Sequence, residues 1–166
     1  MISFREIVAT TGQIILVDSA DYERLAVYRW YIQRDKKSQC EYAVRNEKCA
    51  DGKTRTAAMA REILGLKRGD PRRAEHREPS QTLDNRRSNL RIATQQQNCF
   101  NRRRRTDNTS GYKGVSYHKG HRKYRAYIAV SGKTKSLGER DTAEAAYREL
   151  YVPAALELHG EFARLA

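Results

Sequence analysis

Cysteine is scarce in this sequence and poorly spaced for cross-linking. The three residues Cys40, Cys49 and Cys99 are odd in number and contain no C-x-x-C pair. A disulfide framework or a structural zinc site built on cysteine is therefore not expected. Cys40 and Cys49 could face each other across a hairpin, but free thiols in a reducing cytoplasm are the favoured interpretation.

Long apolar runs are also missing. No stretch approaches the roughly 20 apolar residues that a membrane-spanning helix needs. The opening segment, MISFREIVATTGQ, lacks the basic start and apolar run of a secretory leader. No lipidation signal is present either. The sequence thus predicts a cytoplasmic protein without a membrane partner.

Acidic residues are outnumbered by basic ones. The 33 Lys and Arg residues against 20 Asp and Glu give a formal net charge of +13 over 166 residues. Such an excess is typical of a protein with a polyanion partner, and nucleic acid is the natural choice. The length allows one domain or two small ones, each with a modest core.

One short segment, Arg73 to Arg105, gathers residues suited to phosphodiester hydrolysis. His76 has an ordinary pKa of about 6.5, so it can activate water near neutral pH. A hard divalent cation, Mg²⁺ or Mn²⁺, needs few protein ligands, and Glu75 and Asn98 would supply a carboxylate and an amide oxygen. Asn89 would hold the shape of a loop. The plainer alternatives are a surface His–Glu pair and asparagines that only form turns and caps.

The order His76, Asn89, Asn98 resembles the HNH nuclease motif in its His-Asn-Asn variant, as found in phage and intron homing endonucleases. The sequence LDNRRSNLRIAT at 83–94 is similar to the sequences of that family around this motif. The resemblance implies a ββα-metal core, with His76 on the first strand and Asn89 in the connection. A T-x-x-Q capping box at Thr94 would start the helix that carries Asn98. It also implies a bacterial or phage-infected host cell.

A strongly basic set accompanies this motif. The alternative for the final run is a solvated helix end, but phosphate contact is favoured because the run leads into another basic segment. The expected phosphate-binding residues are Arg86, Arg87, Arg91, Arg102, Arg103, Arg104 and Arg105.

The motif departs from its family at three places. Glu75 stands where the family commonly has aspartate, and Ala60 stands where relatives commonly have a histidine. Pro79-Ser80 replaces the glycine that usually follows the catalytic histidine. These departures leave open a weakened or inactive nuclease that still binds DNA.

The first 70 residues alternate short apolar runs with turn signals, which predicts a small α+β lead-in to the nuclease core. Strands are expected at 13–17, 30–33, 41–46 and 54–57, and short helices at 18–27 and 58–64. Trp30 and Tyr31 are expected in the core, although aromatic rings could also stack on bases.

The segment from Asn108 to Leu165 is similar to the plant ethylene-response-factor DNA-binding domain. The resemblance lies in GYKGV at 111–115, YRAYI at 124–128, LG at 137–138 and DTAEAA at 141–146. It implies a DNA-binding module made of a three-stranded antiparallel sheet and a helix.

The residue pattern agrees with this module. Strands are expected at 112–118, 123–130 and 133–138, and a helix at 142–158 with a kink or break at Pro153. The helix would cover the sheet with a stripe of Ala145, Ala146, Leu150, Ala154 and Leu158. It would pack on Tyr124, Ala126, Ile128 and Val130. The candidate DNA-binding residues are Lys113, Ser116, His118, Arg125, Tyr127, Lys133 and Thr134. The alternative is that these residues only keep an exposed sheet soluble.

Together these features predict an α+β protein with a lead-in and nuclease domain at 1–107 and a DNA-binding domain at 108–166. The expected function is metal-dependent cleavage of double-stranded DNA by a monomer. The alternative is a non-catalytic, sequence-specific DNA-binding protein or a decayed homing endonuclease.

Overall fold

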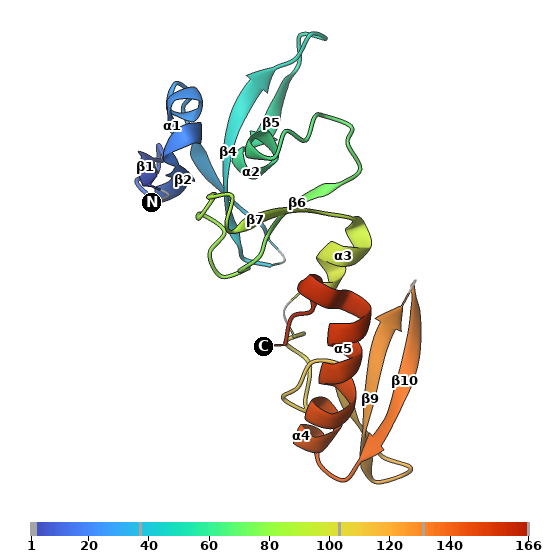
Figure 1. Cartoon of the computed structure of the whole chain (residues 1–166). Coiled ribbons are helices and arrows are strands. Elements are labelled where there is room, and N and C mark those ends of the chain that lie inside the picture. Colours follow the sequence, from blue (N-terminus) through green and yellow to red (C-terminus); the bar gives the residue numbers. More distant parts are fainter. Residues whose placement is uncertain (1–2, 37, 103, 131, 166) are drawn as a thin grey trace. The chain divides into compact units, whose positions relative to one another are not determined.

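The computed structural model describes residues 3–36, 38–102, 104–130 and 132–165. The chain forms two compact units, 1–95 and 96–166, which run from blue to green and from yellow to red in Figure 1. This boundary falls earlier than the one expected after residue 107. The helix that carries Asn98 and the arginine run therefore belong to the second unit.

The first unit begins with an antiparallel hairpin and a helix, which are β1 (Phe4–Val8), β2 (Ile14–Asp18) and α1 (Ser19–Ala26). A three-stranded antiparallel sheet in the order β3-β4-β5 follows, with β3 (Tyr31–Arg34), β4 (Glu41–Lys48) and β5 (Thr54–Ala58). The remaining elements are α2 (Met59–Ile63) and the antiparallel hairpin of β6 (Arg73–His76) and β7 (Leu90–Ala93).

These small elements share one core, because no two- or three-stranded sheet buries enough apolar surface alone. Ile15 and Val17 of β2, Leu25 of α1 and Met59 of α2 are fully buried in it. Trp30 is 1% exposed, and its indole Nε1 donates a hydrogen bond to the Leu25 carbonyl at 2.8 Å. The expected core position of Trp30 is confirmed.

The sequence expectations and the first unit differ in two details. β1 was not expected, because FREIV contains two charged residues and its apolar and polar side chains do not alternate. Asp18 precedes α1 but makes no side-chain capping bond. Its carboxylate instead accepts a hydrogen bond from the Arg87 amide at 2.8 Å. The α+β class itself is confirmed.

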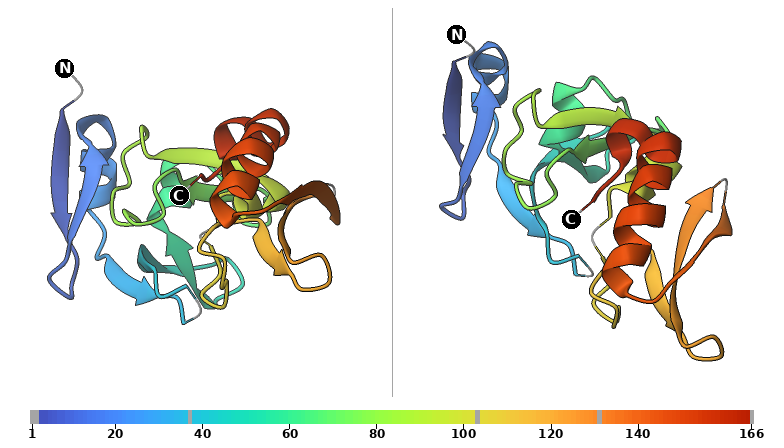
Figure 2. Two further views of the ribbon diagram at one scale, coloured as in Figure 1. Left: turned by 90° about the horizontal axis from the view of Figure 1, so that it is seen from below. Right: turned by 60° about the horizontal axis from the view of Figure 1, so that its bottom comes forward.

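The second unit holds α3 (Gln95–Phe100), whose first residue closes the first unit, and an antiparallel sheet in the order β10-β9-β8. Its strands are β8 (Val115–His118), β9 (Lys123–Val130) and β10 (Lys133–Arg140). A continuous helical segment follows, made of α4 (Ala143–Ala145), a π-helical turn (Ala146–Tyr151) and α5 (Val152–His159), with a final 3₁₀ turn (Gly160–Phe162). This segment lies along one face of the sheet, as both views of Figure 2 show.

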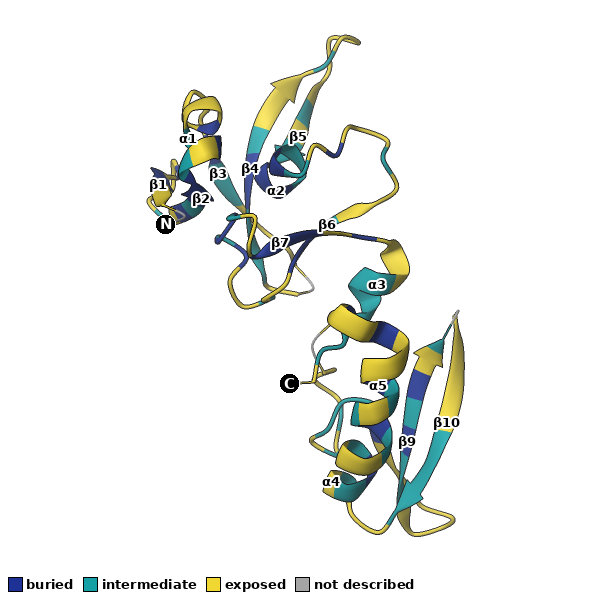
Figure 3. Ribbon diagram, viewed as in Figure 1, coloured by how far each residue is buried: buried dark blue, intermediate teal, exposed yellow. Residues whose placement is uncertain are grey.

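The middle strand of this sheet alternates as predicted. Ala126 and Ile128 are buried, and Tyr124 and Val130 pack against the same core, which is dark blue and teal along β9 in Figure 3. At the start of β8 the chain passes very close to the helix. A Cβ on Gly114, whose φ is +71°, would lie 2.2 Å from the Tyr151 ring, so glycine is required there.

Leu150 and Ala154 of the predicted helical stripe pack against this core, but the prediction for its last member, Leu158, is wrong. Leu158 is 43% exposed, whereas Tyr151 and Ala155 are buried. The cause is the π-helical turn, in which the Val152 amide bonds to the Tyr147 carbonyl, five residues earlier. This turn shifts the buried row by one residue, from a spacing of four to one of five between Ala146 and Tyr151. The interruption directly precedes Pro153, whose ring cannot fit a regular α-turn.

Among the described residues, no helix combines the length and the apolar character needed to cross a bilayer.

Candidate functional site

The β6–β7 hairpin carries the first two predicted site residues. Glu75 pairs across the hairpin with Arg91, and His76 pairs with Leu90. Because neighbouring residues of a strand point to opposite faces, Glu75 and His76 lie on opposite sides of this ribbon. Leu90 belongs to the first core, so His76 lies on the core side.

His76 is only 6% exposed, and its ring lies 6.1 Å from the ring of Tyr42. Burial lowers the pKa of His76 below its usual value of 6.5, while a hydrogen bond with Asn85 and the charge of Asp84 act in the opposite direction. The imidazole is therefore neutral at pH 7, which is the form that a general base requires.

Asn89 closes the loop between the two strands. Its side-chain Oδ1 accepts a hydrogen bond from the Glu78 amide at 3.0 Å, and its Nδ2 donates to the carbonyls of Gln81 and Asp84. The far part of the loop is held on β2, where the Asn85 amide donates to the Leu16 carbonyl at 2.8 Å. The loop is thus fixed by the Asn89 side chain at one end and by a backbone contact with β2 at the other. Its assignment as a catalytic loop stays a prediction.

Three arginines expected to bind phosphate are engaged in ion pairs instead. Arg91 bonds to Glu75 at 2.7 Å, with both side chains buried. Arg86 pairs with Asp84 at 2.6 Å, and Arg87 donates two bonds of 2.9 Å to Asp21. Their expected contact with phosphate stays a prediction, although each of them is already held by a carboxylate. Sequence patterns show the arginines but not the carboxylates that the fold brings to them.

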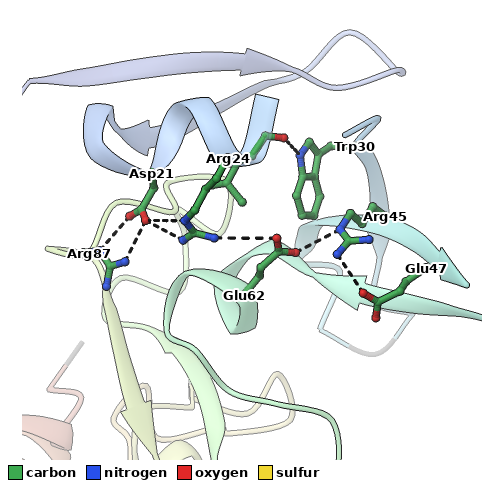
Figure 4. A network of polar contacts seen from close by, with 8 residues as sticks. Asp21, Arg24, Trp30, Arg45, Glu47, Glu62 and Arg87 are labelled. Atoms are coloured by element: carbon green, nitrogen blue, oxygen red, sulfur yellow. Dashed lines mark hydrogen bonds and ion pairs between the residues drawn. The ribbon is translucent and has the colours of Figure 1, made fainter. Parts of the chain in front are cut away.

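The Arg87 pair is part of a network that ties the loop to the lead-in (Figure 4). Asp21 also binds Arg24 at 2.7 Å, and Arg24 approaches Glu62 of α2 at 3.9 Å. Glu62 in turn binds Arg45 of β4 at 3.1 Å. Burial alone would raise the pKa of Asp21, but the hydrogen bonds from Arg87 and Arg24 hold it below its usual value. The network therefore favours a charged Asp21 at neutral pH.

The metal role expected for Glu75 stays a prediction, and its carboxylate is already engaged by an arginine. Arg91 bonds to the Glu75 Oε2 at 2.7 Å in a buried pair, so an ion at Glu75 would have to compete with this guanidinium. A guanidinium at that distance also repels a cation. Asn98, the second expected ligand, lies on α3 in the second unit, and its approach to Glu75 remains a prediction.

Most of the arginine run after α3 is on the surface. Arg102, Arg104 and Arg105 are exposed. Arg105 pairs with Asp107 at 2.7 Å but keeps 83% of its side chain exposed. Arg103 lies outside the described residues. These side chains fit the expected contact with phosphate better than the arginines of the hairpin do.

The face of the second sheet that points away from the helix carries most of the predicted DNA-binding residues. Register pairs Ser116 with Arg125, and Arg125 with Glu139, so these three share that face. His118, Tyr127 and Thr134 lie on the same side by alternation along their strands.

Two candidates of this set are placed elsewhere. Lys133 pairs with Val130, a residue of the helix-covered core, and so projects from the opposite face. The ammonium of Lys113 donates to the Phe100 carbonyl at 2.5 Å. Burial, with a contribution from the charge of Arg164, lowers the pKa of Lys113 to about 8. Lys113 is thus a packed residue of the second unit rather than a free phosphate ligand.

Sequence reasoning missed His121 and Glu139. Both lie near His118 on the face away from the helix, and the His121 Nδ1 lies 2.8 Å from the Glu139 Oε2. The spacing H-x-x-H of His118 and His121 is visible in the sequence, but Glu139 joins them only through the register of β10 with β9.

Comparison with known proteins gives one partial similarity. The chain is 37% identical over 79 residues to Protein 3.8 of Escherichia phage T7. The match covers 46% of this chain and 61% of the phage protein. No family model matches the sequence. No solved structure matches either.

Proposed function

We propose that this protein is a DNA endonuclease of the HNH type, in which β6, β7 and α3 correspond to the ββα core of that family. The observation that carries the proposal is a neutral histidine, His76, at the end of a strand whose following loop is closed by the Asn89 side chain. The similarity to a phage protein supports a phage-infected cell as the setting.

In the proposed reaction, the imidazole of His76 takes a proton from a water molecule as its oxygen attacks the phosphorus of a DNA phosphodiester. A new P–O bond forms, the bond to the 3′ oxygen breaks, and the leaving oxygen is protonated from solvent. Because Glu75 is neutralised by Arg91, no step of this reaction is assigned to a metal. The requirement for Mg²⁺ or Mn²⁺ stays a prediction that the cleavage assay tests directly.

The second unit is proposed to hold the double-stranded DNA. Its support is the exposed run of Arg102, Arg104 and Arg105 together with the face of the sheet that bears Arg125 and Tyr127. Exposed guanidinium groups suit phosphate, and a strand face of this size suits the major groove. Nothing in this arrangement needs a second copy of the chain, so a monomer is proposed.

A nicking assay on supercoiled plasmid tests the proposal. Purified protein is incubated with Mg²⁺, with Mn²⁺ and with EDTA, and open-circular and linear products are measured over time. The proposal expects nicking with at least one of the two ions. Cleavage that is absent under every condition, with DNA binding intact, would leave the alternative function.

That alternative is a DNA-binding protein without catalytic activity. It is favoured by the buried Glu75–Arg91 pair and by the 6% exposure of His76, both of which suit a structural hairpin. Packing in the core is enough to account for a neutral histidine, without a catalytic role. The same assay separates the two functions, because only the endonuclease converts the plasmid.

A further inference from the structure

A second cluster with metal-ligand chemistry lies in the second unit, remote in sequence from the HNH-like hairpin. It consists of His118 at the end of β8, His121 in the turn that follows, and Glu139 on β10. The three potential ligand atoms all lie within 4.8 Å of one another. His118 and Glu139 are half-buried, and His121 is exposed, so an ion has direct access from solvent.

The geometry suits a small tetrahedral ion. The His121 Nδ1 is 2.8 Å from the Glu139 Oε2, and the His118 Nδ1 is 3.7 Å from the Glu139 Oε1. Ligands at about 2.0–2.1 Å from a tetrahedral zinc ion stand roughly 3.3 Å apart. The distance from the His121 Nδ1 to the Glu139 Oε2 is shorter than this value, and all three ligand atoms lie within 4.8 Å of one another, so side-chain rotations suffice to enclose an ion.

The fold already prepares each ligand. The backbone amide of His121 donates to the His118 Nδ1 at 3.3 Å, which holds the two imidazoles at one turn with their ring centroids 4.3 Å apart. Binding an ion through the His118 Nδ1 replaces this hydrogen bond. The Glu139 carboxylate is likewise held in place, by its contacts with His121 and Arg125.

Arg125 is the group that most opposes a cation here. Its Nε and Nη2 both contact one carboxylate oxygen, the Glu139 Oε1, at 2.8 and 2.7 Å. The other oxygen, Oε2, faces His121. A ligating carboxylate is commonly held in this way by a hydrogen bond to its second oxygen. The arginine thus orients Glu139 and leaves the histidine side of the carboxylate for an ion.

We propose that His118, His121 and Glu139 bind one zinc-class transition-metal ion, with a fourth position open to water. Two imidazoles and a carboxylate are a ligand set that suits Zn²⁺, Ni²⁺ and Cu²⁺ and is poorly suited to Mg²⁺, which prefers oxygen ligands. The ion would join the β8–β9 turn to the edge strand β10 and add positive charge to the face proposed to contact DNA. This site is independent of the cleavage chemistry assigned to His76.

Isothermal titration of the full-length, chelator-treated protein with ZnCl₂ tests this site. The proposal expects one ion per chain at this site. Replacement of one ligand, as in His121→Ala or Glu139→Gln, should weaken binding at least about tenfold, the lower end of the range for groups that only support a metal ligand. The matched control is Lys119→Ala, an exposed residue of the same turn that should bind zinc like the parent.

Two further variants exclude other ligands. His76→Ala and Cys99→Ser should leave zinc affinity unchanged, because neither residue belongs to the cluster. Far-ultraviolet circular dichroism of His121→Ala should match the parent, since its side chain is 59% exposed. The proposal is overturned if the parent binds no zinc at 100-fold molar excess, or if His121→Ala and Glu139→Gln bind it as tightly as the parent.

Discussion

The buried Glu75–Arg91 pair allows a test of whether Glu75 is a structural residue or a metal ligand. Arg91 and Glu75 side chains are 7% and 4% exposed and lie 2.7 Å apart. Removing one member of a buried ion pair costs about 3–5 kcal/mol, because the remaining charge loses its compensation. Arg91→Ala should therefore lower the free energy of unfolding of the first unit by about that amount. The double variant Glu75→Gln/Arg91→Met, which removes both charges, should recover most of the loss.

Urea unfolding followed by tryptophan fluorescence measures this effect. Trp30 is the single tryptophan of the chain and is buried in the first core, so its signal reports that unit. The second part of the test measures how Mg²⁺ changes the stability of the first unit. An ion bound at 100 times its dissociation constant stabilises a fold by about 2.7 kcal/mol. We expect the parent and Glu75→Gln to respond equally to Mg²⁺. A loss below about 1 kcal/mol in Arg91→Ala, or a stabilisation by Mg²⁺ that Glu75→Gln abolishes, would refute the structural assignment.

Three more predictions concern DNA binding, packing and pH. The logarithm of DNA affinity should fall with the logarithm of salt concentration with a slope of at least about 4.5, which corresponds to five phosphate contacts. Arg102→Gln should lower this slope by about 0.9, whereas Arg87→Gln should leave it unchanged because Arg87 is bonded to Asp21. A flat salt response of the parent would remove DNA as the main partner. In circular dichroism melts, Gly114→Ala should destabilise the second unit by about 2–4 kcal/mol, because the added methyl group meets the Tyr151 ring and the backbone is left-handed. Gly132→Ala has a φ of +78° but open space around it, so it should cost about 1 kcal/mol. Equal losses of stability in the two variants would contradict the close contact at Gly114. Folding lowers the pKa of His76, so as the pH falls below about 6.5 this histidine is protonated in the unfolded chain before it is protonated in the folded one. The stability measured by Trp30 fluorescence should therefore decrease from pH 7.5 to 5.5. His76→Gln should flatten that dependence.

Much of the fold follows from local patterns. The alternation of β9 predicted which of its residues face the helix, because side chains on a strand have a strict period of two. The first-unit strands and helices also fall close to their expected positions, since turn signals such as Asp51-Gly52 separate them. The burial of Tyr151 and Ala155 could not be predicted, because one π-helical turn changes the phase of the helix.

The candidate site was less accessible to sequence reasoning. The motif indicated His76 and Asn89, but it did not indicate that Glu75 would be neutralised by its cross-strand neighbour Arg91. Ala60, expected near substrate by resemblance, is 7% exposed and packed in the first core. A histidine there would overpack the core, so Ala60→His is not expected to raise cleavage. Contacts between residues distant in sequence decided each of these cases.

Single-turnover cleavage by His76→Ala tests the central proposal most directly. The parent and the variant are compared on the same supercoiled plasmid, with DNA affinity measured beside the rate. Loss of a general base should lower the rate at least about a hundredfold, while DNA affinity changes little because the proposed DNA contacts lie in the second unit. Cleavage by His76→Ala at the rate of the parent would contradict the assignment of His76 as the base.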